Sequence, residues 1–143
     1  MLADNSLIHD IKTIITQSRE QAVRAVNHER TVMYWHIGQR IFEEEQRGKE
    51  RADYGAYLVQ MIAERLQPEF GSGFSKRQIS YCRQLYRTFP IVHALRAQLS
   101  WTQYKMLLSI DNEDKREFYI AESVKNNWTS RQLERQINSQ LYE

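Results

Sequence analysis

The sequence has little cysteine, glycine and proline, and it has no long hydrophobic run. One cysteine, Cys82, among 143 residues excludes an internal disulfide and a multi-cysteine zinc site. Five glycines and two prolines disfavour a turn-rich β fold. A membrane-spanning helix needs ~20 apolar residues, far more than any run here. The first residues also lack a basic cluster followed by an apolar stretch, so we predict no secretory signal and expect a cytoplasmic protein.

Carboxylates are missing from the middle of the chain. Residues 70–110 contain no Asp or Glu but six basic residues: Lys76, Arg77, Arg83, Arg87, Arg96 and Lys105. The net charge of +2 therefore divides into a block of +6 and a remainder of −4. Two interpretations follow: the block contacts a polyanion, or it pairs with the acidic remainder of the chain.

The residues that are abundant favour helices, and their spacing predicts an all-α bundle of six or seven helices. The first helix is expected over about residues 6–47, which is longer than a small domain needs. Either it breaks near Asn27, or it projects and packs on another chain. Gly38 lies inside this helix, where glycine is unfavourable, so we expect a close helix–helix contact there; the alternative is that the glycine is simply tolerated.

Capping patterns mark the starts of the later helices. We expect Asp53 to cap a helix that ends at Gln67-Pro68, and Ser75 with Gln78 to form a capping box for a helix over residues 75–89. Three further starts are predicted at Ser100 with Gln103, at Asp111-Asn112, and at Thr129 with Gln132.

The helix over 54–66, a turn and the helix over 75–89 predict a helix-turn-helix-like pair, although the turn is longer than in simple units. With the core centred on Ile79, Cys82 and Tyr86, the second helix presents side chains suited to DNA on its outer face. The predicted nucleic-acid contacts are Ser75, Lys76, Arg77, Ser80, Tyr81, Gln84 and Arg87, with Arg96, Lys105 and Arg131 as flanking phosphate contacts. The alternative is a helix whose outer face is merely solvated.

No pattern in the chain predicts catalysis. Two histidines at positions 28 and 36 have no third ligand, and a solvated helix face explains Glu43–Glu45 better than a metal site does. Cys82 falls on the buried stripe and is expected to be an inert core thiol. We therefore expect no catalytic residue, metal or cofactor in this segment.

Two resemblances bear on function. Residues 54–137 loosely resemble the helix-turn-helix region of ParB-type partition proteins, through Ala63 to Leu66, Leu99-Ser100-Trp101, Asp111-Asn112-Glu113 and Trp128 to Glu134. Nearly the whole chain is similar, more closely, to the N-terminal domain of the bacterial YhcG-like nuclease family. That similarity rests on Tyr34 to Gly38, Glu44-Glu45-Gln46, Gly48-Lys49, Arg51 to Gly55, Gly73-Phe74-Ser75, Phe89-Pro90, Leu99 to Tyr104, Asn126-Asn127-Trp128 and Leu133 to Ile137.

The second resemblance implies a fragment of a longer protein with a C-terminal PD-(D/E)xK nuclease domain. Residues 1–50 would form a helical segment that can act as a dimerisation arm, and residues 51–143 the helix-turn-helix-like domain. The expected function is a non-catalytic DNA-binding module that positions the metal-dependent nuclease. The alternative is an oligomerisation or protein-binding module without nucleic-acid contact. We expect duplex DNA and a second copy of the chain as partners, with no membrane and no small-molecule substrate.

Overall fold

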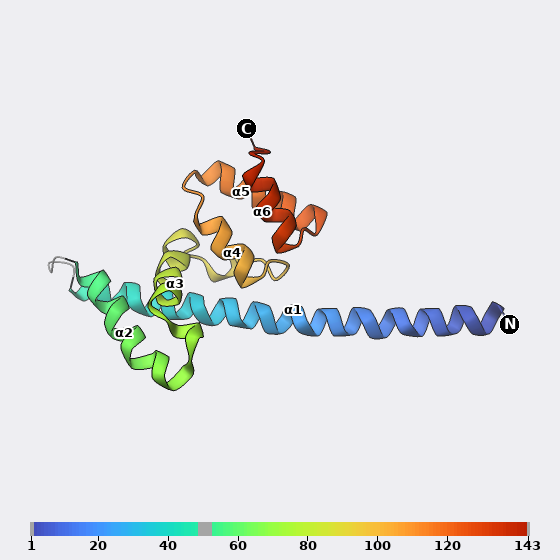
Figure 1. Ribbon diagram of the computed structural model, residues 1–143, viewed down its shortest axis with the longest axis horizontal. Helices are drawn as coiled ribbons and strands as arrows, with labels where there is room; N and C mark the ends of the chain where they lie inside the picture. The colour runs from blue at the N-terminus through green and yellow to red at the C-terminus, as the bar shows by residue number, and fades with distance from the viewer. Residues whose placement is uncertain (1, 49–52, 143) are drawn as a thin grey trace.

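The computed structural model describes residues 2–48 and 53–142, and within these ranges it is entirely helical. Six α-helices and two short 3-10 helices follow one another, and the described residues contain no strand (Figure 1). The elements are α1 (Leu2–Arg47), α2 (Tyr54–Phe70), η1 (Ser72–Phe74), α3 (Lys76–Thr88), η2 (Val92–Ala94), α4 (Trp101–Leu108), α5 (Glu113–Asn126) and α6 (Ser130–Asn138). The predicted all-α fold with a long first helix is confirmed. The predicted domain boundary at residue 50 lies outside the described residues.

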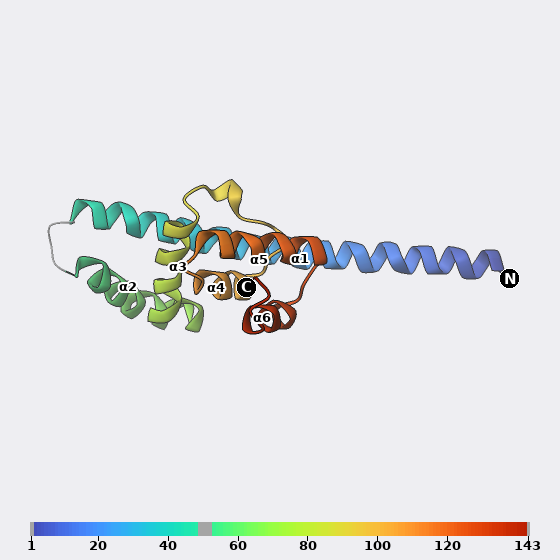
Figure 2. The ribbon, with the colours of Figure 1, turned by 90° about the horizontal axis from the view of Figure 1, so that it is seen from above.

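Helix α1 is continuous over 46 residues, which corresponds to about 69 Å at 1.5 Å per residue. No break occurs near Asn27. The C-terminal half of α1 packs against the other helices, whereas its N-terminal half extends well past them (Figures 1 and 2). Of the two expected outcomes, a break or a projection, the helix therefore shows the projection.

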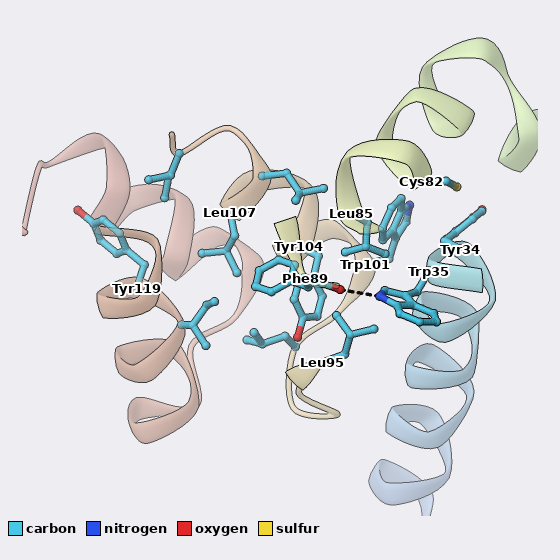
Figure 3. Packing of buried hydrophobic residues seen from close by; sticks show 14 of the residues in the cluster. Tyr34, Trp35, Cys82, Leu85, Phe89, Leu95, Trp101, Tyr104, Leu107 and Tyr119 are labelled. Carbon is cyan, nitrogen blue, oxygen red and sulfur yellow. Dashed lines mark hydrogen bonds between the residues drawn. The ribbon is translucent and has the colours of Figure 1, made fainter. Parts of the chain in front are cut away.

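Two aromatic side chains of α1 hold the two ends of α3. Tyr34 donates its hydroxyl hydrogen to the carbonyl of Gly73, just before α3, at 2.9 Å. Trp35 donates its indole N–H to the carbonyl of Phe89, just after α3, at 2.6 Å (Figure 3). Both carbonyls therefore have partners, and the bonds fix α3 across α1.

The hydrophobic core lies where α1, α3 and α4 meet, and it continues between α4, α5 and α6 (Figure 3). A smaller cluster lies beneath α2. The main cluster includes Tyr34, Trp35, Cys82, Leu85, Phe89, Trp101, Tyr104, Leu107, Tyr119 and Leu133. The smaller one comprises Ile41, Val59, Ala63 and Ile79. Because α3 contributes to both, its outer face is held on a rigid support.

Most predicted helix starts are confirmed, with two corrections. Complete capping boxes form at Ser100 with Gln103 and at Thr129 with Gln132, and Asn112 caps α5. Asp53, in contrast, adopts a left-handed conformation with φ of 58° and makes no side-chain cap. Helix α2 also continues through Pro68 to Phe70, so the predicted end at Gln67-Pro68 is wrong.

The capping box predicted at Ser75 forms only in part. The Ser75 hydroxyl accepts a hydrogen bond from the Gln78 amide at 3.3 Å. The Gln78 side chain, instead of returning to the backbone of Ser75, accepts a hydrogen bond from the Trp101 indole at 2.9 Å. Burial of that indole requires a partner, so a tertiary contact replaces the local one.

Candidate nucleic-acid interface

Helix α3 separates into a buried and an outer face, as its sequence predicts. Ile79 and Cys82 are fully buried, whereas Lys76, Arg77 and Ser80 are exposed. A serine cap at the start and an apolar residue at every third or fourth position give the helix this orientation. The outer face is therefore available to a ligand.

Three residues of α3 and α4 form a cluster of two cations around one ring. The Arg77 guanidinium carbon lies 5.7 Å from the centre of the Tyr81 ring, and an Arg77 nitrogen lies 3.4 Å from the Tyr81 hydroxyl oxygen. The Lys105 ammonium lies 6.0 Å from the centres of both the Tyr81 and Trp101 rings. Cation–π contacts of this kind hold charged side chains in place. We refer to Arg77, Tyr81 and Lys105 as the cationic cluster.

The cationic cluster lies between two hollows. The α2–α3 groove, of about 620 Å³, is lined by Ala56, Val59, Lys76, Arg77, Ser80, Tyr81, Arg83 and Gln84. The α3–α4 pocket, of about 420 Å³, is lined by Arg77, Gln78, Tyr81, Thr102, Lys105, Met106 and Ser109. Arg77 and Tyr81 belong to both and form the ridge between them. Among the described residues, no carboxylate lines either hollow, so the side chains that line them contribute only positive charge.

One carboxylate of α1 pairs with two of the six cations. Glu45 accepts hydrogen bonds from Arg83 at 2.5 and 3.0 Å and from Arg87 at 3.2 Å. The hydrogen bond from Arg83 lowers the pKa of Glu45 below its ordinary value, and the same bond raises the pKa of Arg83. The interpretation that the basic block pairs with the acidic remainder therefore holds for these two arginines. Across residues 2–48 and 53–142, the other four cations of the block form no ion pair.

Two of the predicted contact residues have structural partners. Gln84 donates its amide N–H to the Leu108 carbonyl at 2.7 Å and so holds the C-terminal end of α4. Ser75 caps α3. Both residues thus contribute to stability, whatever else they contact.

Arg96 and Arg131 lie apart from the cationic cluster. Arg96 follows η2, beyond the C-terminal end of α3, and its backbone N–H donates to the Tyr104 hydroxyl. Arg131 lies on α6 beside Glu134, Arg135 and Asn138. The structure therefore brings together the predicted residues of α3 with Lys105, and leaves these two arginines on other parts of the surface.

The sequence analysis identified Lys105 but none of the other α4 residues that contribute to this surface. Thr102, Met106 and Ser109 complete the α3–α4 pocket, and Trp101 supports Lys105. Nothing in the spacing of α3 and α4 signals that they lie side by side, because that neighbourhood depends on packing across the chain.

Other side chains that could bind a metal or react are isolated from one another. In the part of the chain that is described, no three His, Cys, Asp or Glu residues come together as a metal site. The Cys82 thiol is buried, and burial raises its pKa far above the ordinary value, so it is unreactive. Within the same residues, no helix is long and apolar enough to span a membrane.

The geometry can now be compared with known proteins. Residues 10–143 match the DUF1016 N-terminal domain. The chain belongs to this family. The DUF1016 N-terminal domain described here is also 33% identical, over 169 residues, to the Escherichia coli (strain K12) protein named "Putative nuclease YhcG". The aligned region covers 95% of this chain and 45% of that relative, so the chain spans less than half of the relative's length. No solved structure matches.

These matches confirm the resemblance to the N-terminal domain of the YhcG-like nucleases. The looser resemblance to ParB-type proteins stays a prediction.

Proposed function

We propose that this DUF1016 N-terminal domain is a non-catalytic module that binds nucleic acid through the outer face of α3 and the adjacent side of α4. Duplex DNA is the expected ligand. In the full-length protein, within the cytoplasm, the module would position a metal-dependent PD-(D/E)xK nuclease domain on its substrate. The helix-turn-helix-like pair is then α2 and α3, joined through η1.

The observation that carries this proposal is the cationic cluster. Arg77 and Lys105 are held against the Tyr81 ring, and no carboxylate of residues 2–48 or 53–142 lines the hollows on either side. A surface of this charge attracts the phosphate backbone, which supplies most of the non-specific affinity for DNA. The printed name of the relative, "Putative nuclease YhcG", also supports a nucleic-acid ligand.

The outer face of α3 also carries groups that can read bases. The planar N–H donors of Arg77 suit either a guanine edge or a phosphate, while Lys76 and Ser80 can contact phosphates. Lys76 lies in the first turn of α3, where free amides and the positive end of the helix dipole favour an anion. Docking by the N-terminal part of such a helix is the usual geometry for helix-turn-helix proteins.

A salt-dependent binding titration tests the proposal. Fluorescence anisotropy is measured with a labelled duplex DNA, a duplex RNA and a single strand of the same length, between low and physiological salt. We expect duplex DNA to bind most tightly, and its affinity to fall with salt at a log–log slope of roughly −0.9 per phosphate neutralised. No binding at low salt, or affinity that ignores salt, would contradict the proposal.

A second function is favoured by the arm of α1. Large apolar side chains are exposed along its projecting half: Leu7, Ile8, Ile11, Ile14, Ile15, Val23 and Val26. At about 100° per residue, Ile11 lies on the opposite side of α1 from Gly38, which faces the core. The part of this stripe around Ile11 therefore does not continue the domain's own core, whereas Val23 lies at the helical angle of the buried Ile41. We call these seven residues the arm stripe.

We propose that the arm stripe packs on the same stripe of a second copy. A two-fold dimer joins the same surface of both copies. The charges of residues 1–30 balance, with Asp4, Asp10, Glu20 and Glu29 against Lys12, Arg19, Arg24 and Arg30. The polar residues 16–21 interrupt a strict heptad seam, so we expect a dimer of moderate affinity. Light scattering over a range of protein concentrations tests it, and a monomer at the highest concentration would refute it.

A further inference from the structure

The α3–α4 pocket is lined by two cationic side chains, and neither forms an ion pair with another described residue. Arg77 and Lys105 both line it, and each lies about 6 Å from the centre of one ring, that of Tyr81. Because both side chains line this one pocket, an anion bound in it can reach both cations and gain two charge-assisted contacts.

The helices that form the pocket run in the same direction. Gln78 contacts Trp101 at their N-terminal ends, at 2.9 Å, and Gln84 contacts the Leu108 carbonyl at their C-terminal ends, at 2.7 Å. Tyr81 and Lys105 face each other midway. The positive dipole ends of α3 and α4 therefore lie at the same end of the pocket, where Arg77 and Thr102 occupy the first turns of the two helices.

The polar groups around the pocket suit a tetrahedral oxyanion. Arg77 supplies a planar set of N–H donors and Lys105 a compact ammonium, and the exposed Thr102, in the first turn of α4, carries a hydroxyl beside them. The Tyr81 hydroxyl already interacts with Arg77 and orients its guanidinium. All of these groups can donate hydrogen bonds, and no carboxylate competes for them.

From this geometry we infer that the α3–α4 pocket is a phosphate site, in which Arg77 and Lys105 hold one phosphate group of the nucleic acid between them. The inference rests on the proposed function and adds that these two residues share one phosphate, instead of each contacting a separate one. The phosphate belongs either to a continuous strand or to a strand end.

The test measures the salt slope of duplex binding for four forms of the chain. They are the wild type, Arg77→Gln, Lys105→Gln and the double variant. A matched control, Lys125→Gln, changes a lysine of α5 that lies outside the pocket. If one phosphate is shared, the double variant loses roughly 0.9 of slope in total, and the effects of the single variants on affinity are not additive. Lys105→Arg should retain the wild-type slope, because the charge is kept. Thermal melts establish that each variant is folded.

Two duplexes separate the sources of the phosphate, one with 5′-hydroxyl and one with 5′-phosphate ends. If Lys105 contributes to the binding of both duplexes, the phosphate belongs to the continuous backbone. If Lys105 contributes only to the binding of the duplex with 5′-phosphate ends, the phosphate belongs to a strand end. Either result supports the site. If the salt slope of the double variant falls by roughly 1.8, or if the effects of the single variants on affinity are additive, the shared phosphate is overturned. Pocket variants that bind like Lys125→Gln also overturn it. In those cases wild-type binding still upholds the proposed function. A wild type that binds neither duplex refutes the proposed function, and this inference with it.

Discussion

Gly38 of α1 touches the backbone of α3 at Cys82. A Cβ atom at position 38 would lie 2.0 Å from the carbonyl oxygen of Cys82 and 2.9 Å from its carbonyl carbon. Backbone atoms cannot move aside as a flexible side chain can, so the two helices could not keep this approach with any other residue. The close contact predicted from the unfavourable glycine is confirmed.

We therefore expect Gly38→Ala to destabilise the fold, although alanine is the better helix former by about 1 kcal/mol. The overlap with Cys82 must separate α1 from α3, and overpacking of this kind costs about 1–3 kcal/mol. Urea unfolding measures the change. Ser18→Ala, on the projecting half of α1, is the control and should not lower stability.

A second prediction concerns Glu45, whose side chain is only 12% exposed and holds two arginines of α3. Glu45→Gln removes the negative charge and leaves Arg83 and Arg87 without it. Hydrogen bonds to charged groups contribute about 1.5–3 kcal/mol. We expect the free energy of unfolding to fall by an amount near the lower end of that range, because Arg87 is half exposed. The exposed Glu43→Gln should change the free energy of unfolding little.

The same residue predicts a dependence on pH. The folded pKa of Glu45 is below its ordinary value of 4.5, so its contribution is fully present above that value. It is lost as the pH falls through the lower, folded pKa. The difference in unfolding free energy between the wild type and Glu45→Gln should therefore be constant from pH 7 to about 5 and shrink towards pH 3. Urea titrations at each pH measure it, and a difference that grows on acidification would contradict the ion pairs.

A third prediction separates binding from stability on α3. Arg77→Ala should weaken nucleic-acid binding and change stability by less than about 0.5 kcal/mol, as exposed substitutions usually do. Ile79→Ala should instead cost about 2–5 kcal/mol through lost burial and a cavity. Gln84→Ala should cost about 0.5–1.5 kcal/mol, because the Leu108 carbonyl loses its donor. Thermal melts and anisotropy on the same samples distinguish the three, and an unfolded Arg77→Ala would contradict the assignment of the outer face.

A fourth prediction tests the arm stripe with two equal charges on opposite faces of α1. Ile11→Glu places a carboxylate in the stripe and should shift the light-scattering mass towards the monomer. Thr13→Glu places the same charge on a face turned away from the stripe and should leave the mass unchanged. Both variants should melt like the wild type, because both positions are exposed and remote from the core. Equal masses for the two variants would refute pairing through the stripe.

The sequence alone determined the helical fold, most helix starts and the orientation of α3. These features depend on local chemistry: caps such as Ser100 with Gln103 act within one turn, and the spacing of Ile79 and Cys82 defines a buried face within one helix. The sequence also identified the family. Local rules failed where a tertiary partner was available, as when Gln78 bonded to Trp101 in place of the Ser75 backbone.

Only the tertiary structure decided which charges are neutralised. Glu45 and Arg83 are far apart in sequence, and the crossing of α1 and α3 at Gly38 brings their charges together. Lys105 reaches Tyr81 because α3 and α4 lie parallel, a relation that the hydrophobic pattern of neither helix contains. Periodicity reports which face of a helix is buried, but the identity of the neighbour depends on how all the helices share one core.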